Sequence, residues 1–332
     1  PSPPRLAAIR MAVGQPFLTQ EEITMNIRSI LAVTDLSARG NRTVERAALL
    51  AVEHDALLKI MYAPAARSLR VDAASSLAKL SSEIAARHGV LVKKVTEAAG
   101  RLEDVADEAR WVDLVVLEHA YERTATAFFH GQPVERLLRL VGCPVLVTRL
   151  PARAKYRRIL VAVNFTPAAK DLVKLASSLD SAAEVEVFHA LVSALTEGKL
   201  RYASVSEDII KAYRQDCVRQ AIDGMRWLTD SWDARRDHLR STIRHGDPAR
   251  QAATQQQCTM AELLVVGKRK SSALQDFIFG SMAKRVLERS TGDVLIVPHD
   301  ARASTRAIDT PGSSLAKERM REAPLHIGKE AL

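Results

Sequence analysis

The sequence predicts an α/β fold in which two open, doubly wound parallel sheets follow one another along the chain. Short apolar runs alternate with longer segments rich in Ala and Leu, which is typical of parallel strands covered by helices on both faces. The order of these segments is the same in the two halves of the chain. The length of 332 residues also exceeds what one hydrophobic core usually organises. We therefore expect two tandem domains of the same fold.

The internal repeat locates the expected strands. The matching segments are Arg28–Ser37 with Arg157–Thr166, Lys59–Ala63 with Glu186–Ala190, Asp113–Glu118 with Glu262–Gly267, and Pro144–Val147 with Asp293–Ile296. Each contains a β-branched or apolar run of the kind that forms a buried strand. The spacing between the last two pairs is the same in both halves, whereas the spacing before them differs. The extra residues of the second half therefore lie in its middle, and we expect a longer helical segment over Leu191–Trp232.

The domain boundaries follow from where the repeat begins and stops. The expected organisation is a flexible N-terminal extension over residues 1–25, a first domain over 26–149, a linker over 150–158, a second domain over 159–298 and a flexible C-terminal tail over 299–332. Neither end shows the apolar periodicity of a core element. In the linker, Pro151 and a cluster of basic residues interrupt the pattern, so we expect a solvated hinge there.

Composition and charge exclude several classes of protein. No apolar run approaches the roughly 20 residues of a membrane-spanning helix, and the start of the sequence lacks the pattern of a secretory signal, so we expect a cytoplasmic protein. The three cysteines form no CxxC pair, which excludes a disulfide framework and a zinc knuckle. The net charge of +9 favours anionic ligands. Because the basic residues are interleaved with acidic ones and aromatics make up only 5%, we expect no sequence-specific binding of nucleic acid.

A basic segment with glycines at both ends follows one of the repeated strands in the second half. In open parallel sheets, ligands bind beyond the carboxyl ends of the strands. Gly267 permits close approach of the backbone to a ligand, and Lys268 and Lys270 supply positive charge. We expect Gly280 and Ser281 to open a helix and to offer amide and hydroxyl donors. The segment predicts a phosphate-binding site, and the alternative is an ordinary capped helix after a solvated basic turn.

Signatures of familiar enzymes are missing from the sequence. Neither half contains a GxxxxGK[ST] loop or a GxGxxG turn after its first strand, which argues against P-loop ATPases and dinucleotide-binding dehydrogenases. Asp35 follows a strand, whereas Asp113 and Glu262 precede one, so these carboxylates are expected at opposite ends of the sheet and form no acid–base pair. The spacing of His119 and His130 matches no standard set of metal ligands, and we predict no metal site.

Taken together, the repeated motifs resemble those of a tandem universal stress protein, with two copies of that family's domain over Asn26–Pro298. The resemblance implies an adenine nucleotide alpha-hydrolase-like fold. It also implies a ligand, because the nucleotide-binding members of the family bind ATP or AMP. Those members carry Gly-x2-Gly-x9-Gly-Ser/Thr after their fourth strand and an Asp after their first strand that contacts adenosine.

The two halves match this family pattern to different extents. The second half reads Gly267-x2-Lys270-x9-Gly280-Ser281. Its spacing is intact, but Lys270 replaces the middle glycine and Asn164 replaces the Asp. The first half retains the Asp as Asp35, whereas both early glycines are lost and Glu118 places a carboxylate near the expected phosphate position. The resemblance therefore implies a nucleotide site in the second domain and a degenerate site in the first, with Asp35 as a weak candidate contact.

The function that this resemblance implies is that of a stress-response protein which binds ATP or AMP in its second domain and regulates a protein partner. Mg²⁺ would accompany ATP, and slow ATP hydrolysis is the most that we expect of an enzyme activity. Family dimers associate through their final strands, so the two halves should pack as an intramolecular pseudo-dimer with Val145, Val147, Val294 and Ile296 in the seam. The sequence does not decide whether the whole chain also forms a homodimer. The alternatives are a scaffold with two decayed sites and a carrier of another anionic ligand, such as a lipid.

Overall fold

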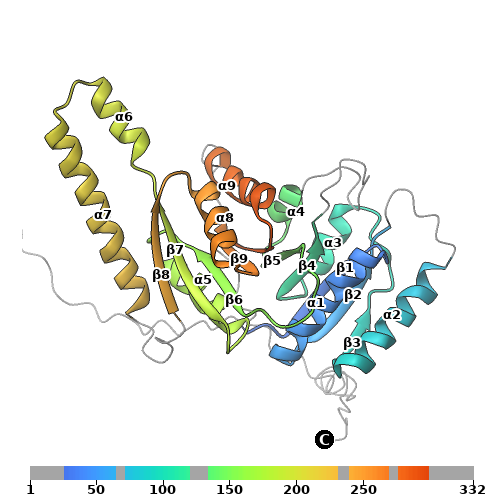
Figure 1. Cartoon of the computed structure of the whole chain (residues 1–332). Helices are drawn as coiled ribbons and strands as arrows, with labels where there is room; N and C mark the ends of the chain where they lie inside the picture. The colour runs from blue at the N-terminus through green and yellow to red at the C-terminus, as the bar shows by residue number, and fades with distance from the viewer. Residues whose placement is uncertain (1–25, 65–71, 120–133, 231–238, 269–275, 299–332) are drawn as a thin grey trace, which may run out of the picture.

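The protein is described by a computed structural model that covers residues 26–64, 72–119, 134–230, 239–268 and 276–298. Within these ranges one ten-stranded sheet has the order β3-β2-β1-β4-β5-β10-β9-β6-β7-β8 (Figure 1). The strands are β1 (Ser29–Thr34), β2 (Leu57–Tyr62), β3 (Val92–Lys94), β4 (Leu114–Glu118), β5 (Val145–Thr148), β6 (Arg158–Ala162), β7 (Glu184–Leu191), β8 (Leu239–His245), β9 (Leu263–Lys268) and β10 (Asp293–Pro298). The expected flexible ends, residues 1–25 and 299–332, lie outside the described residues.

Helices cover both faces of the sheet, as the sequence predicts. They are α1 (Ala38–His54), α2 (Ala73–His88), α3 (Leu102–Ala109), α4 (Val134–Leu140), α5 (Pro167–Ser178), α6 (Ala194–Tyr202), α7 (Glu207–Thr229), α8 (Pro248–Thr259) and α9 (Asp276–Arg289). Buried residues of α1, α2, α5 and α7 share one core with the sheet, and those of α3, α4, α8 and α9 share the other. Successive residues of β1 alternate between the two cores, Ile30 in the first and Leu31 in the second.

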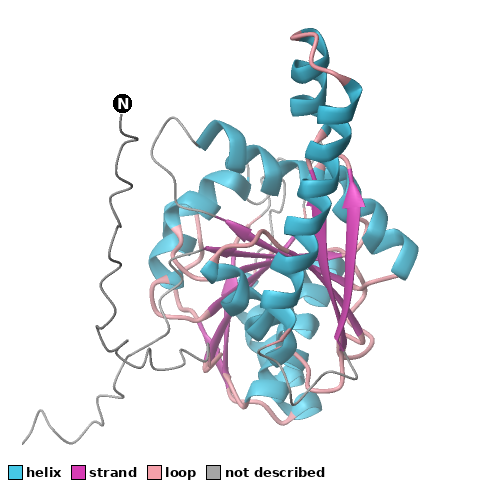
Figure 2. Ribbon diagram, turned by 90° about the vertical axis from the view of Figure 1, so that its left-hand side faces the viewer, coloured by secondary structure: helices cyan, strands magenta, loops and turns pink. Residues whose placement is uncertain are grey.

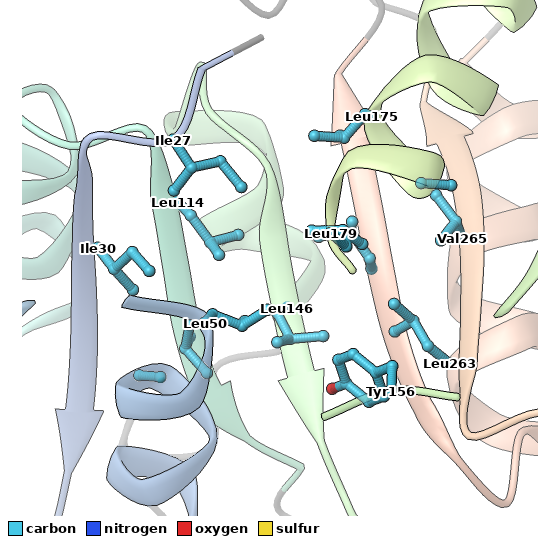
Figure 3. Packing of buried hydrophobic residues seen from close by; sticks show 14 of the residues in the cluster. Ile27, Ile30, Leu50, Leu114, Leu146, Tyr156, Leu175, Leu179, Leu263 and Val265 are labelled. Atoms are coloured by element: carbon cyan, nitrogen blue, oxygen red, sulfur yellow. The ribbon is translucent and has the colours of Figure 1, made fainter. Parts of the chain in front are cut away.

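The two halves of the chain meet where β5 pairs with β10. This pair is antiparallel, with Val147 opposite Val294 and Val145 opposite Ile296, whereas the other strand pairs of the described sheet are parallel. The expected association of the final strands is confirmed in the register of these four residues. Figure 3 shows Leu146 of β5 between labelled core residues of the first half and those of the second. We call the β5–β10 pair and the residues packed on it the seam.

A carboxylate side chain binds the backbone at the first residues of β1, and an equivalent one does so at β6. The Asp113 carboxylate accepts hydrogen bonds from the backbone N–H groups of Arg28 and Ser29, at 2.9 and 3.0 Å, just where β1 starts. The Glu262 carboxylate accepts from the backbone N–H of Arg158, at 3.1 Å, where β6 starts. Asp113 lies at the end of the sheet opposite Asp35, as the sequence predicts. Glu262 does not: it lies at the same end as Asp35, because the antiparallel β5–β10 pair reverses the strand direction between the two halves. The matching hydrogen bonds of Asp113 and Glu262 extend the internal repeat from sequence to structure.

The linker is exposed at most of its residues, as its proline and basic residues predict, but it is anchored to both halves of the chain. Tyr156 is buried, and its hydroxyl donates a 2.6 Å hydrogen bond to the Asp293 carboxylate at the start of β10. A second contact comes from α1, where Arg46 donates to the carbonyl oxygen of Ala154 at 2.7 Å. The linker is therefore bound to the first half through Ala154 and to the second half through Tyr156. Tyr156 also provides the hydrogen-bond donor that the buried Asp293 carboxylate requires.

The longer helical segment expected in the second half is present as α6 and α7. Among the described residues, α2 is the helix between β2 and β3 in the first half, whereas both α6 and α7 lie between β7 and β8 in the second half. The two helices project beyond the sheet as an arm (Figures 1 and 2). An ion pair between Glu197 of α6 and Arg214 of α7, at 2.5 Å, joins them. In the part of the chain that the structure describes, no helix has the length and apolar character needed to cross a membrane.

Candidate functional site

The candidate site of the second half lies where the strand order of the sheet reverses. From β6 the chain continues outward to β7, whereas β9, on the other side of β6, is followed by β10. Ala162 of β6 pairs with Val266 of β9, so Asn164 and Lys268 stand two residues further along at the carboxyl ends of these strands. In open α/β sheets, the crevice at such a reversal is the usual place for a ligand.

Asn164 is held in a tight turn between β6 and α5. Its Oδ1 accepts a 2.8 Å hydrogen bond from the hydroxyl of Thr166, the residue that precedes the first turn of α5. Pro167 occupies the start of the helix, where its missing N–H costs nothing. Asn164 is half-buried, and the turn engages the oxygen of its amide.

An aromatic contact supports this turn from β7. The rings of Phe165 and His189 lie with their centroids 4.2 Å apart. Nδ1 of His189 donates a 2.9 Å hydrogen bond to the carbonyl oxygen of Val163, which fixes the orientation of the imidazole. Burial lowers the pKa of His189, so the ring is neutral near pH 7. His189 therefore packs and orients the loop beside the candidate site, and acid–base chemistry is not required to explain its position.

Helix α7 of the arm packs against Phe165 of this aromatic pair, a contact that the sequence did not predict. Gly224 of α7 lies directly against Phe165, because a Cβ atom at residue 224 would come within 2.5 Å of the ring. One turn further, Trp227 of α7 lies under the ammonium of Lys170 in α5, at 4.1 Å from the ring centroid. The sequence does contain one indication of this contact: Gly224 lies inside a long helix, and a glycine at such a position usually marks close packing.

Gly267 and Lys268, the first glycine and the first lysine of the basic segment, both lie on β9. Gly267 lies inside β9, where it pairs with Val297 of β10, and the strand continues through Lys268, slightly beyond its expected end. The backbone at Gly267 is therefore part of the sheet, with its strand end reaching the candidate site. Lys270 lies outside the described residues.

The expectation that Gly280 and Ser281 open a helix is wrong. Helix α9 begins at Asp276, so both residues lie in its second turn. Only the first four N–H groups of a helix lack partners within it, and residue 280 is already the fifth. The amide groups of Gly280 and Ser281 are therefore committed to the helix, and phosphate binding through them would need the first turn to open.

The equivalent place in the first half is crowded by carboxylates. The Asp35 Oδ1 atom accepts a 2.8 Å hydrogen bond from the backbone N–H of Ser37, and Gly40 of α1 packs against the same atom. Burial, followed by the negative charge of Asp35, raises the pKa of Glu118 at the end of β4. The two acidic groups are thus close enough for the charge of one to affect the other.

The histidine that follows Glu118 is equally adapted to burial. Loss of hydration, together with the positive charge of Arg149, lowers the pKa of His119 to about 4. Among the residues that the structure describes, no group of three or more His, Cys, Asp and Glu side chains is arranged to hold a metal ion. His130, the other histidine of this segment, lies outside these residues.

One family model matches the second half of the chain. Residues 155–298 match the model of the Universal stress protein family. A search of the curated proteins found no match.

Solved structures resemble a larger part of the chain. A putative universal stress protein from Pseudomonas aeruginosa UCBPP-PA14 is 20% identical with a TM-score of 0.58, and the match covers 85% of this chain and 99% of the other. A functionally unknown protein from Pseudomonas aeruginosa PAO1 is 19% identical with a TM-score of 0.57 and the same coverage. A universal stress protein from Archaeoglobus fulgidus DSM 4304 is 14% identical with a TM-score of 0.55, over 83% of this chain and 98% of the other. At these identities the likeness concerns the fold.

Proposed function

From the premise that residues 155–298 form a universal stress protein domain, we propose that this domain binds ATP or AMP and that the protein acts as a nucleotide-dependent regulator of a protein partner. The observation that carries the proposal is the position of Asn164 beside the end of β9, at the reversal of strand order. A side-chain amide there can hydrogen-bond to a ribose hydroxyl or an adenine edge, as the Asp of the family pattern does, without adding negative charge.

The proposed contacts divide into two groups. Asn164 faces the adenosine, and Gly267 lets the end of β9 approach the ligand. Lys268 and Lys270 balance the charge of the phosphates, while Gly280 and Ser281 would contact phosphate oxygens once the first turn of α9 opens. Because α9 commits the amides of the last two residues, the lysines would provide most of the phosphate affinity. Mg²⁺ would enter with ATP, bound mainly to its phosphates.

The whole chain, in this proposal, is a pair of universal stress protein domains. Residues 26–149 form the first and residues 159–298 the second, joined by the linker over 150–158. The antiparallel pairing of β5 with β10 supports an intramolecular pseudo-dimer, as do the matching roles of Asp113 and Glu262. The negative charges of Asp35 and Glu118, which affect one another, support a first domain that does not bind nucleotide.

A scaffold with no nucleotide at all is the second candidate. The early start of α9 favours it, because this helix would have to change before its residues could bind phosphate. In that case the chain would recognise its partner through its surface, with the α6–α7 arm as its most prominent feature (Figure 1).

The test compares two equivalent positions in one chain. ATP and AMP, each with and without Mg²⁺, are titrated calorimetrically into the full chain and into the variants Asn164→Ala and Asp35→Ala. We expect about one nucleotide per chain, and a loss of about tenfold or more in affinity for Asn164→Ala with little change for Asp35→Ala. Equal losses for both variants would contradict a single site in the second domain. No binding of either nucleotide at millimolar concentration would favour the scaffold.

The regulatory part of the proposal needs a separate measurement. The full chain and Asn164→Ala are immobilised and exposed to a cell extract with and without ATP, and the retained proteins are identified by mass spectrometry. A partner whose capture by the full chain depends on ATP, and whose capture by the variant does not, would support nucleotide-dependent regulation. Identical capture in all four conditions would contradict it.

A further inference from the structure

A polar cavity lies against the seam, at the carboxyl end of the first half of the sheet and away from the candidate nucleotide site. Its volume is about 340 Å³, and Leu150 is the one aliphatic residue among its described lining. The lining comes from the first turns of α1, the ends of β4 and β5, and the turn that precedes β10. Residues from both halves of the chain therefore surround one space of a size suited to a small molecule.

Arginines dominate the charge of this cavity. Arg39 and Arg42 are three residues apart on α1, so they lie on the same side of the helix, and Arg149 approaches from the end of β5. Both α1 side chains are exposed, and neither forms an ion pair with the described residues, although Arg42 Nε donates to the carbonyl oxygen of Ala38 at 3.3 Å. Three arginines face one lining carboxylate, that of Glu118. The cavity is positively charged even if the nearby Asp35 is included.

Contacts to the second half hold Arg149 in place. Its backbone N–H donates a 2.7 Å hydrogen bond to Asp293, and its guanidinium donates to the carbonyl oxygen of Leu287 at the end of α9. Thr291, from the turn between α9 and β10, lines the same space. The cavity is thus preorganised by the seam, and a ligand in it would contact both halves at once.

Buried hydroxyls line the inner end of the cavity. Thr43 of α1 and Thr148 of β5 form a 2.7 Å hydrogen bond between their hydroxyl groups, and both residues are almost fully buried. The Thr148 hydroxyl also lies 3.3 Å from the carbonyl oxygen of Leu117, to which it can donate. If Thr148 donates to Leu117 and Thr43 donates to Thr148, both hydroxyl hydrogens are used within the protein, so these residues shape the cavity while the arginines supply the donors to a ligand.

Glu118 is the group that opposes an anion here. Its pKa is raised mainly by burial and further by Asp35, while Arg39 and Arg42 act in the other direction. His119 beside it is neutral near pH 7 because its pKa is about 4. Proton uptake by Glu118 would convert an opposing charge into a donor, so the carboxylate lowers affinity without blocking the site.

We propose that this arginine-lined cavity at the seam binds the phosphate group of a small molecule, in a site distinct from the nucleotide site of the second half. Arg39, Arg42 and Arg149 would provide the charge-assisted hydrogen bonds, and Thr291 would close the site from the other half. A ligand bound there would hold α1 and the turn before β10 together, and would thereby stabilise the seam.

The test uses inorganic pyrophosphate as the probe and compares opposite changes in one cavity. Pyrophosphate is titrated calorimetrically into the full chain, into Arg39→Ala/Arg42→Ala, and into Glu118→Gln. We expect the arginine variant to bind about tenfold or more weakly and Glu118→Gln to bind more tightly. The matched control is Arg219→Ala/Arg226→Ala, which removes two exposed arginines from α7 and should change the affinity by less than about twofold.

One more variant and a second probe distinguish this cavity from the nucleotide site and from a carboxylate site. Asn164→Ala should leave the pyrophosphate binding unchanged, and a loss there would assign the probe to the second half and overturn the proposal. Equal binding by the full chain and by Arg39→Ala/Arg42→Ala would overturn it as well. Citrate binding more tightly than pyrophosphate would show that the cavity takes carboxylates and not phosphates. Because Arg39 and Arg42 are exposed, circular dichroism should confirm that their variant folds normally.

Discussion

The hydroxyl of Tyr156 lies 2.6 Å from a carboxylate oxygen of Asp293, and this buried contact joins the linker to the first residue of β10. The guanidinium of Arg46 lies 4.1 Å from the centroid of the Tyr156 ring and 3.5 Å from the same carboxylate. All three side chains are almost completely buried, and they come from α1, the linker and β10. Two features therefore hold the seam together: the pairing of β5 with β10, and the buried polar cluster of Arg46, Tyr156 and Asp293. A buried charge without a partner is costly, so each member of this cluster depends on the others.

Removing the Tyr156 hydroxyl should weaken the seam. In Tyr156→Phe the Asp293 carboxylate loses a short hydrogen bond while it stays buried, so we expect the free energy of unfolding to fall by about 1–3 kcal/mol. Urea denaturation of the full chain measures the change. The control is Tyr202→Phe, because Tyr202 is 94% exposed and its hydroxyl should contribute less than about 0.5 kcal/mol. Equal effects of the two substitutions would contradict a special role for the buried hydroxyl.

The same contact predicts how stability depends on alkaline pH. Burial and the negative charge of Asp293 raise the pKa of Tyr156 well above its ordinary value of 10.0. Above pH 10 the unfolded chain loses this proton while the folded chain keeps it, so the free energy of unfolding should decrease as the pH rises. Tyr156→Phe should show a smaller decrease than the unchanged protein between about pH 9 and 11. Parallel pH profiles for the two proteins would contradict the predicted shift.

Much of the fold could be predicted from the sequence because buried strands have a simple pattern. The apolar runs of β1, β4, β6 and β9 all lie in the interior of a half-sheet. The pairing of Val147 with Val294 was expected from the resemblance to family dimers, which associate through their final strands. The edge strands β3 and β8 were missed. Their residues, such as Lys93 and Arg240, are largely exposed, so no apolar run marks them.

The site could be predicted less completely, because its geometry depends on contacts between distant segments. The position of Asn164 follows from its place after a strand. The role of Gly224 does not, since it depends on α7 packing against Phe165. Likewise Tyr156 in a basic, proline-containing segment gives no sign that Asp293 lies beside it. Spacing alone also cannot show that α9 begins before Gly280.

His119 predicts a loss of stability in mild acid. Its pKa is about 4 in the folded protein against an ordinary value of 6.5, because burial disfavours the charged ring. Between pH 6.5 and 4 the unfolded chain binds a proton that the folded chain does not, so stability falls as the pH falls through this range. The contribution of this one group is at most about 3 kcal/mol.

Two histidine variants separate this contribution from other acid effects. The difference in unfolding free energy between pH 7 and pH 4.5 should be smaller for His119→Gln than for the unchanged protein. His245→Gln, which changes an exposed histidine at the end of β8, should leave that difference as it is. A smaller difference in both variants, or in neither, would show that burial of His119 is not the cause.

The contact between Gly224 and Phe165 predicts that a single methyl group disturbs the candidate site. A Cβ atom at residue 224 would lie 2.5 Å from the Phe165 ring, so Gly224→Ala must displace either α7 or the ring that stacks on His189. Overpacking of this kind costs about 1–3 kcal/mol, which exceeds the gain of at most about 1 kcal/mol from placing Ala in a helix. We expect lower stability, and also weaker nucleotide binding, because Phe165 adjoins Asn164.

Gly198 in α6 provides the matched control, since nothing lies within 4 Å of the position that its Cβ would occupy. Gly198→Ala should keep the helical gain without the clash and should stabilise the protein by about 0.5–1 kcal/mol. Urea denaturation, together with the fluorescence of Trp227 beside Lys170, measures both variants. Opposite signs for the two substitutions are expected because only Gly224 faces a ring. Stabilisation by both would mean that α7 moves away without cost, and the arm would then have no part in shaping the site.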